Sequence, residues 1–230
     1  MDRLLNKLNT KKMCLIASLP ENSYELAKIA WEAGVDAIKV HINVSLHRAS
    51  QNHFGSLEEN KEVFKKILHD SPVPVGIVAG EQGFAAEAVV DEIVKMGFDF
   101  ISLYGHHTPP TLVMRNDINN FFALNSNYSF DEIKVIANSF VADILELSIV
   151  APENYGERLS ARELAKYEYI AHLTNKPAVV PTQKVIYPSD ILALYKTKVK
   201  AVMVGAIAMG KEKETIKKTL MAFRSEIDKL

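Results

Sequence analysis

The sequence predicts an α/β protein whose single domain, residues 1–230, is a closed (β/α)8 (TIM) barrel. Short apolar runs rich in β-branched residues alternate along the whole chain with amphipathic segments of helical length, as in a parallel sheet built from βα units. There are eight such runs, and 230 residues with 48% hydrophobic content suffice for the core of one barrel. We therefore expect one domain rather than two.

The expected elements follow the chain in strict alternation. Strands are expected near residues 13–18, 36–42, 73–79, 98–104, 120–125, 143–149, 177–183 and 200–206. Helices are expected at Tyr24–Ala33, Leu57–His69, Ala85–Met96, Phe130–Phe140, Ala161–Leu173 and Glu212–Ile227. A shorter helix near Thr111–Asn116 has the weakest pattern, so the connection between the fourth and fifth strands is the least defined part of the barrel.

A quasi-repeat leads into every second strand. Four segments align without gaps, at residues 34–41 (GVDAIKVH), 97–104 (GFDFISLY), 141–148 (VADILELS) and 198–205 (KVKAVMVG). Each contains the end of a helix, a polar residue and then a strand. A doubly wound open sheet would also alternate strands with helices, but eight units with a repeat at every second unit favour closure into a barrel.

Alternation along these four strands separates an apolar face, suited to packing under the helices, from a more polar face. The more polar face should point into the barrel, where alternate strands supply the same layer of side chains. The layer predicted first consists of Lys39, Ser102, Glu146 and Met203. The layer one step nearer the C-terminal mouth consists of His41, Tyr104, Ser148 and Gly205.

Lys39 and Glu146 are the predicted centre of an active site. A barrel that needed only stability would fill its interior with valine, isoleucine and leucine, because burying charge is costly. The structural alternative is an ion pair that fills the centre of the barrel, but such pairs stabilise less than apolar residues of similar volume. Active sites in this fold lie where the strands end, which favours a catalytic or substrate-binding role for both residues.

The predicted chemistry is proton transfer next to a carbonyl group. A lysine in a partly desolvated pocket can act as a general base or as an amine nucleophile, and a nearby glutamate can be its acid–base partner. Lys39 and Glu146 come from opposite sides of the ring, so we expect a substrate between them. His41 and Tyr104, nearer the mouth, are expected to donate hydrogen bonds to a carbonyl or enediolate oxygen.

Further polar residues at the strand ends are candidates for substrate binding. They are Glu81, Ser102, Asn125, Ser148 and Arg48. Arg48 lies in a long polar segment, residues 43–55, which has the character of a lid or specificity loop; the alternative is a solvated loop arginine. A metal held by His41, His106 and either Glu146 or Glu81 is disfavoured by the absence of a recognisable ligand spacing. We expect no metal and no cofactor.

The loops after the seventh and eighth strands are candidates for a phosphate site, because barrels commonly bind phosphate there. The candidate residues are Gln183, Lys184, Gly205 and Ala206. Glycine after the eighth strand has a structural alternative, which is to let the last helix pack closely.

Residues 179–190 (VVPTQKVIYPSD), residues 199–207 (VKAVMVGAI) and residues 213–217 (KETIK) together resemble the phosphate-binding barrels of the ribulose-phosphate-binding superfamily. Within that group, this C-terminal third is most similar to the N-acylmannosamine-6-phosphate 2-epimerase family. The resemblance implies a phosphate site at Gly205 and Ala206. The family's paired glycines, its strand-seven Glu-Gly and its strand-three lysine are absent here, so its catalytic pair does not transfer.

The composition limits the classes of partner. Lysine and arginine (27) nearly balance aspartate and glutamate (28), so no basic field for nucleic acid is expected. No apolar stretch has the length of a membrane span, and the N-terminal segment lacks a signal-peptide core. The single cysteine, Cys14, lies in an apolar run and fits a small core residue in a reducing compartment. We expect a cytoplasmic protein that binds a small phosphorylated molecule and can form a homodimer.

The leading functional hypothesis is an isomerase or epimerase of a small phosphorylated sugar or carbonyl compound. A Schiff-base aldolase that uses Lys39 is the first alternative, since an amine can attack a carbonyl. A barrel that binds such ligands without catalysis is the second.

Overall fold

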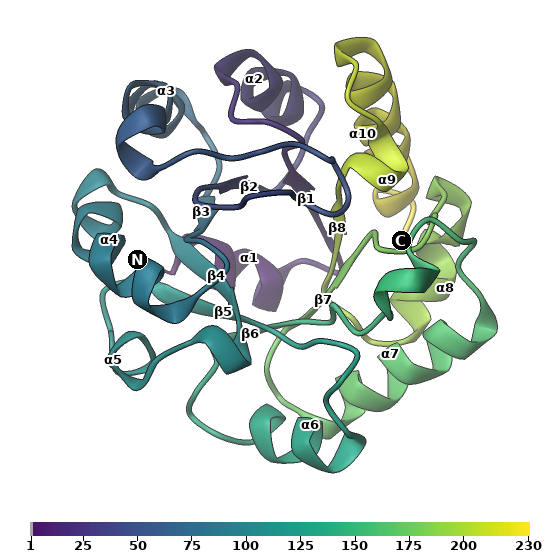
Figure 1. Ribbon diagram of the computed structural model, residues 1–230. Coiled ribbons are helices and arrows are strands. Elements are labelled where there is room, and N and C mark those ends of the chain that lie inside the picture. The colour runs from purple at the N-terminus through teal and green to yellow at the C-terminus, as the bar shows by residue number, and fades with distance from the viewer. Residues whose placement is uncertain (1) are drawn as a thin grey trace.

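Eight parallel strands form a closed ring in the computed structural model, which describes residues 2–230 (Figure 1). The strands are β1 (Cys14–Ser18), β2 (Ala37–His41), β3 (Val75–Val78), β4 (Phe100–Tyr104), β5 (Asn119–Ala123), β6 (Ile144–Glu146), β7 (Ala178–Pro181) and β8 (Ala201–Val204). Each strand pairs with its neighbours in sequence, and β8 pairs with β1 to close the barrel. The predicted barrel is confirmed, with strand ends shifted by up to three residues.

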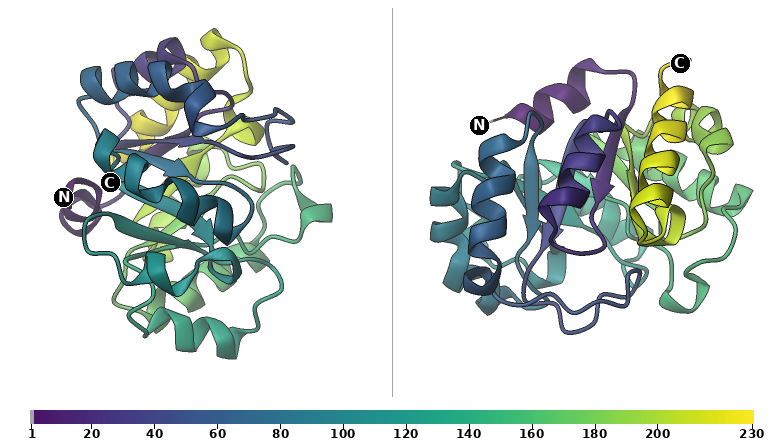
Figure 2. Two further views of the ribbon diagram at one scale, coloured as in Figure 1. Left: turned by 60° about the vertical axis from the view of Figure 1, so that its left-hand side comes forward. Right: turned by 90° about the horizontal axis from the view of Figure 1, so that it is seen from above.

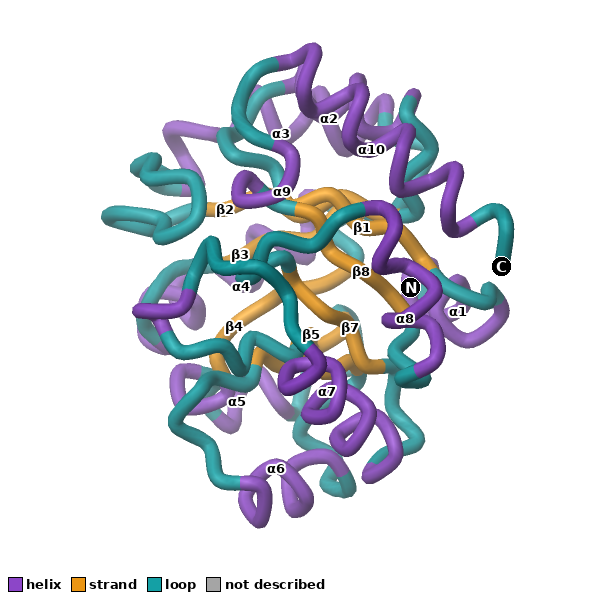
Figure 3. Tube along the Cα trace, turned by 90° about the vertical axis from the view of Figure 1, so that its right-hand side faces the viewer, coloured by secondary structure: helices purple, strands orange, loops and turns teal. Residues whose placement is uncertain are grey.

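Helices surround the ring of strands, as the tube view shows (Figure 3). They are α1 (Arg3–Thr10), α2 (Tyr24–Glu32), α3 (Leu57–Asp70), α4 (Gly83–Met96), α5 (Pro110–Val113), α6 (Phe130–Ala137), α7 (Ala161–Leu173), α8 (Ile191–Lys196), α9 (Ala206–Met209) and α10 (Lys213–Ile227). The six strongly patterned helices are confirmed, whereas α5 is a single turn that begins at a proline. Among the residues described, no helix has the length and apolarity needed to cross a membrane.

Serine capping boxes begin three of the outer helices, α3, α6 and α7. At the start of α3, the Ser56 hydroxyl accepts the amide of Glu59, and the Glu59 carboxylate accepts the amide of Ser56 at 2.6 Å. These contacts satisfy amides that have no partner within the helix. They also set the residue at which each helix leaves its βα loop, and so limit the length of the loops at the C-terminal mouth.

The lower half of the barrel interior, toward the N-terminal ends of the strands, is apolar. Phe100 and Phe121 stack at 5.2 Å across this half, and Gly76 on β3 provides the space for the Phe100 ring. A Cβ atom at Gly76 would lie 2.0 Å from that ring, so a larger residue would displace it. The sequence analysis did not foresee α1, whose fully buried Leu4 and Leu8 close this end of the barrel.

The two ends of the barrel differ in what covers them (Figure 2). In the left-hand view of Figure 2, α1 lies across one end, while the loops after β2 and β6 extend from the other. A helix that packs leucine into the interior leaves no room for a ligand. The C-terminal mouth is therefore the end at which a cavity can form.

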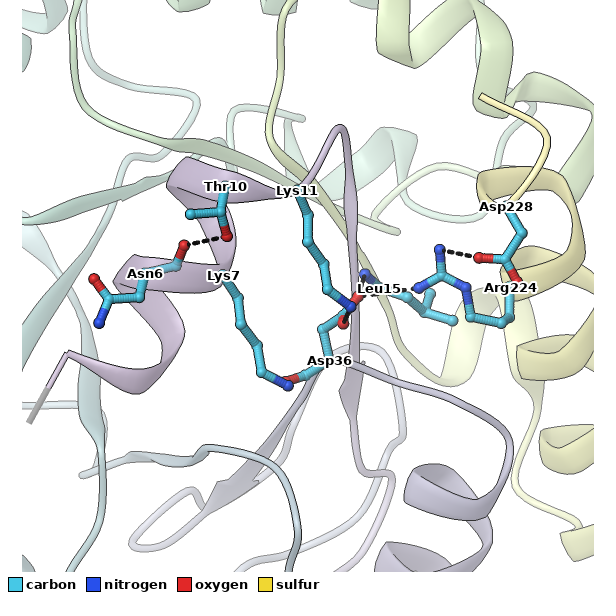
Figure 4. Close-up of polar contacts among 8 residues, drawn as sticks. All are labelled: Asn6, Lys7, Thr10, Lys11, Leu15, Asp36, Arg224 and Asp228. Carbon is cyan, nitrogen blue, oxygen red and sulfur yellow. Dashed lines mark hydrogen bonds and ion pairs between the residues drawn. The ribbon is translucent and has the colours of Figure 1, made fainter.

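Asp36, at the start of β2, joins the closed end together (Figure 4). Its buried carboxylate accepts the amide of Leu15 at 2.9 Å, forms an ion pair with Lys11, and contacts Arg224 at 3.1 Å. Lys7 of α1 donates to the Asp36 carbonyl at 3.1 Å. One carboxylate thus connects β1 and β2 with α1 and α10.

The polar residue of the sequence repeat has the same role in three of the four segments. Asp99 accepts the amide of Val75 at 2.8 Å, and Asp143 accepts the amide of Asn120 at 2.7 Å. Each aspartate therefore ties the start of an even-numbered strand to the odd-numbered strand before it, as Asp36 does. The repeat detected in the sequence corresponds to a repeated backbone clamp.

Candidate active site

A cavity of about 700 Å³ occupies the C-terminal mouth of the barrel. This volume lies within the range of roughly 300–1,000 Å³ that is typical of small-molecule sites. Residues at the ends of all eight strands contribute to its lining, among them Ser18, Lys39, Val78, Tyr104, Ala123, Glu146, Pro181 and Met203. The strand order therefore brings to one place side chains that are far apart in the sequence.

Lys39 and Glu146 form an ion pair on the floor of this cavity. Lys39 Nζ lies 2.9 Å from Glu146 Oε2, and the two side chains are 6% and 8% exposed. Ser102 donates to the same carboxylate oxygen at 3.2 Å, and Ser148 donates to Oε1 at 2.8 Å. The predicted grouping of Lys39, Ser102 and Glu146 agrees with these contacts, and three donors orient one carboxylate.

The contact between Lys39 and Glu146 differs from one expectation. A substrate was expected between the two groups, one on each face, but in the structure the groups touch each other. They reach each other because β2 and β6 lie on opposite sides of the ring and both side chains extend to its centre. The pair can therefore address a ligand from one side, above the floor that it forms.

His41 is buried at the end of β2 and keeps one ring nitrogen without a partner. Its Nε2 lies 3.5 Å from the Ser18 hydroxyl, whereas no hydrogen-bond partner for Nδ1 is found among residues 2–230. The ring packs against His47 and Phe54, each with a centroid distance of 4.7 Å. Burial, with smaller contributions from His47 and Lys39, holds the pKa of His41 well below its usual range, so the imidazole is neutral.

The segment 43–55 is folded into an arm that leans on His41. Val44 and Phe54 pair as an antiparallel bridge, and Ser45 is anchored by its hydroxyl to Glu81 at 2.9 Å. His47 on this arm accepts the Ser50 amide at 3.2 Å through Nδ1. Burial and the charge of Lys39 lower the pKa of His47 to about 4, so this ring is also neutral.

Arg48, at the tip of the arm, crosses toward the segment that follows β6. Its guanidinium lies over the Tyr155 ring, 5.7 Å from the centroid. Among the described residues, no carboxylate forms an ion pair with Arg48, although it lines the cavity. Lys39 is paired with Glu146, so Arg48 is the cavity-lining cation available to an anionic ligand within residues 2–230.

Tyr104 and Asn125 line the β4–β5 side of the mouth, as predicted from their positions at the strand ends. Tyr104 is 38% exposed, so its ring is open to a ligand. The Asn125 side chain accepts the amide of Asn127 at 2.9 Å, which fixes its orientation. Glu81 also lines the cavity, but its carboxylate serves as the anchor of Ser45.

The loop after β7 places its candidate phosphate residues differently from the prediction. Lys184 forms an ion pair with Glu157 at 2.6 Å and is not among the cavity-lining residues, because the segment after β6 offers it a closer anion. Gln183 does line the cavity, but its side chain accepts the Val150 amide at 3.1 Å and donates to the Tyr155 hydroxyl. Both residues hold the segment after β6 in place.

The turn after β8 offers one backbone donor at the position predicted for a phosphate. The Gly205 amide donates to the Thr182 hydroxyl at 2.8 Å and is already satisfied. Ala206 begins α9, and the first bonds of that helix are donated by Ala208 and Met209 to the Gly205 carbonyl, both at 3.0 Å. The amide of Ala206 precedes these bonds and is the donor left for a ligand.

Several cavity residues were missed from the sequence. Ser18 ends β1 on the same face as Cys14 and Ile16, so the alternation rule that identified Lys39 would have found it. Thr182 sits directly after β7 and satisfies Gly205. His47 and Tyr155 belong to long loops, where no periodic signal exists, and only the folded chain brings them to the cavity.

The metal alternative is not supported by the geometry. Residues 2–230 contain no group of three or more histidine, cysteine, aspartate or glutamate side chains that could hold a metal ion. His106 contacts Tyr128 on the β4–β5 side, and Glu81 anchors Ser45, so neither joins His41 and Glu146.

The fold and the cavity define a (β/α)8 barrel with a buried charged pair at the C-terminal ends of its strands. No protein-family model and no curated protein matches the sequence. Solved structures do match. Thiamine phosphate pyrophosphorylase from Pyrococcus furiosus is 17% identical, with a TM-score of 0.64 over 95% of this chain and 97% of that chain.

Two further structures have the same fold. The tryptophan synthase α-subunit from Pyrococcus furiosus is 15% identical, with a TM-score of 0.68 over 94% of this chain and 98% of that chain. KGPDC from Streptococcus mutans, solved in complex with a phosphorylated small molecule, is 14% identical, with a TM-score of 0.68 over 95% and 99% of the two chains. At these identities the likeness establishes the fold, and the residues of this chain must carry the argument about function.

Proposed function

We propose that this protein is an enzyme that transfers a proton next to the carbonyl group of a small phosphorylated substrate, as an isomerase. The observation that carries the proposal is the Lys39–Glu146 pair on the cavity floor. A buried ion pair stabilises a fold less than apolar residues of similar volume. Its position at the C-terminal strand ends, where this fold places its catalytic groups, gives it a chemical use.

Glu146 is the proposed base. Its carboxylate accepts hydrogen bonds from Lys39, Ser102 and Ser148, which fix its direction. The Lys39 ammonium stands beside it, where it can stabilise the negative oxygen that develops when the carbon acid loses its proton. Because the two groups touch, they act on one face of the substrate, which favours a one-base isomerase over an epimerase with a base on each face.

His41 is the proposed neutral hydrogen-bond donor to the substrate oxygen. A buried imidazole with an unpartnered nitrogen gains a hydrogen bond when a ligand supplies the missing group. Its lowered pKa keeps it neutral, and a neutral imidazole can polarise a carbonyl without giving up its proton completely. Tyr104 is the further donor proposed at the mouth.

The phosphate of the substrate is proposed to lie at the β8 side, on the Ala206 amide, with Arg48 as the counter-charge above it. Two observations support an anionic ligand: Arg48 lines the cavity without a carboxylate partner among the described residues, and the neighbours in fold include a thiamine phosphate enzyme and a complex with a phosphorylated small molecule. Lys184 and Gln183 are not part of this proposal, because their side chains are engaged elsewhere.

The test is hydrogen exchange in heavy water. Aldose and ketose phosphates are incubated with the protein, and the loss of the proton next to the carbonyl is followed by NMR. We expect exchange with at least one of these compounds, and none with Lys39→Met. Glu62→Gln, an exposed change on α3, is the control. Full exchange by the Lys39→Met variant would contradict the assignment of the pair.

A Schiff-base aldolase is the second candidate, and one observation favours it. Glu146 Oε2 lies 2.9 Å from Lys39 Nζ and can accept the proton that the amine must lose before it attacks a carbonyl. Borohydride added with substrate would then trap covalent mass on Lys39. Exchange without trapping supports the isomerase, trapping supports the aldolase, and binding without either supports a ligand-binding barrel.

A further inference from the structure

A row of rings covers the β4 side of the cavity. Tyr104 and His106 stack with a centroid distance of 5.5 Å and an angle of 23° between their planes. His106 and His107 continue the row at 4.1 Å. All three line the cavity, and Tyr155 lines it from the segment after β6. The site described above assigns a task to Tyr104 alone, so most of this surface is unused.

The row is held in place from behind. The His106 Nδ1 atom lies 3.0 Å from the Tyr128 hydroxyl, and the Asn125 side-chain amide lies 3.5 Å from the same nitrogen. Tyr128 does not line the cavity, so its contact fixes the ring without occupying the space in front of it. Burial and the neighbouring His107 lower the pKa of His106, which favours an uncharged ring. The surface offered to a ligand is therefore rigid and flat.

The order of strands places this row opposite the proposed phosphate end. In a closed ring of eight, β4 and β8 are diametrically opposed, and so are β2 and β6. Lys39 and Glu146 span one diameter, and the line from Ala206 to Tyr104 spans the other. A ligand that lies across the ion pair with its phosphate at β8 therefore points its other end at the rings.

We propose that the Tyr104–His106–His107 row binds a planar heteroaromatic ring carried by the substrate at the end opposite its phosphate. Flat aromatic surfaces stack on planar rings, and such contacts tolerate many ring types because each offers a π-face. The side chains of Asn125 and Asn127 stand beside the row and can read the polar edge of a ring. The location of the phosphate in this inference rests on the proposed function.

The test compares ligands that differ only in the ring. Isothermal titration measures the binding of ribose 5-phosphate, adenosine 5′-monophosphate, uridine 5′-monophosphate and adenosine. We expect at least one nucleotide to bind about tenfold or more tightly than ribose 5-phosphate. We expect Tyr104→Leu to remove this difference while the affinity for ribose 5-phosphate is retained. Tyr169→Leu, which changes an exposed tyrosine of α7, is the matched control and should change neither affinity.

The outcomes separate this inference from the proposed function. If ribose 5-phosphate binds and neither ring strengthens it, the ring subsite is overturned and the phosphate end stands. If adenosine binds in a Tyr104-dependent way and ribose 5-phosphate does not bind, the ring subsite stands and the phosphate end fails. If no ring-bearing ligand shows binding that depends on Tyr104, the inference is overturned. Binding of ribose 5-phosphate or an unchanged circular dichroism spectrum shows that the Tyr104→Leu variant is folded.

Discussion

The two ends of the even-numbered strands carry polar residues three positions apart, and these residues have different partners. At the N-terminal end, Asp143 accepts a backbone amide of the neighbouring strand at 2.7 Å. At the C-terminal end of the same strand, Glu146 accepts hydrogen bonds from side chains alone and faces a cavity. Asp36 and Lys39 on β2 show the same contrast.

The difference teaches how to separate an architectural polar residue from a functional one. A carboxylate whose partner is a backbone amide restrains the chain, because losing it leaves a backbone group unsatisfied. A carboxylate whose partners are other side chains restrains those side chains, and the fold could replace the whole group with apolar residues. Polar type and burial are similar at both ends, so the partner is the informative quantity.

The largest expected effect is on catalysis and comes from the C-terminal end. Glu146→Gln keeps the shape of the side chain but removes the proposed base, so turnover should fall by about 100- to 10,000-fold. The measurement is the initial rate on a substrate identified by exchange, with the fold checked by circular dichroism. Asp143→Ala, three residues earlier on the same strand, should leave the rate of the folded protein unchanged. Equal losses in the two variants would erase the distinction between the ends.

The second prediction concerns stability at the N-terminal end. Asp36→Ala removes the acceptor of Leu15 and leaves Arg224 without its buried partner, so the free energy of unfolding should fall by about 3–5 kcal/mol. Asp143→Ala breaks one amide contact and no ion pair, so it should cost about 1–3 kcal/mol. Urea unfolding of both variants measures the two values. The reverse ranking would show that the ion pairs of Asp36 contribute little.

Much of the barrel could be predicted because its signals are local and repeated. The apolar runs, the helix pattern and the segments at 34–41, 97–104, 141–148 and 198–205 each reflect a period that burial imposes on the sequence. The plug helix α1 was missed, since its eight residues carry the apolar positions Leu4 and Leu8 among charges and resemble a solvated segment. Whether such a segment closes a barrel is decided by tertiary packing.

The candidate site divides along the same line. Lys39, Ser102 and Glu146 lie together, as alternation predicts, because inward position on a strand follows from its period of two. Lys184 was assigned to a phosphate site, but its side chain turns to Glu157, a loop residue whose position no periodicity encodes. The contacts of His47 and Tyr155 are equally beyond sequence reasoning, because loop geometry depends on what the loops meet.

A third prediction sharpens the comparison at the C-terminal end. Replacing the whole pair, as Lys39→Met with Glu146→Leu, should leave the free energy of unfolding unchanged or raise it by about 1–4 kcal/mol, while proton exchange is lost. Lys39→Met alone leaves a buried carboxylate without its counter-charge and should cost about 3–5 kcal/mol. Urea unfolding of the single and double variants provides the measurement. A double variant as unstable as Asp36→Ala would mean that the pair is architectural.

The smallest expected effect is a pH dependence confined to the C-terminal end. His41 and His47 have lowered pKa values in the folded state, about 4 for His47, whereas an unfolded histidine titrates near 6.5. Above the unfolded value neither state binds the proton and stability is complete. As the pH falls from 6.5 toward 4, the unfolded chain binds protons that the folded chain excludes, so stability falls, by up to about 1.4 kcal/mol per pH unit for each histidine.

His47→Asn retains a hydrogen-bond acceptor and removes one of these protons, so it should reduce the loss of stability between about pH 7.5 and about pH 5.5. Urea midpoints at the two values measure the loss, and comparison with the unaltered chain cancels groups that titrate elsewhere. Amide hydrogen exchange at the lower pH should rise in the arm 43–55, which packs His47 on His41, before it rises in α1. Earlier exchange in α1 would place the acid-sensitive groups at the closed end, where Asp36 and its cations hold the chain, and would reverse the comparison.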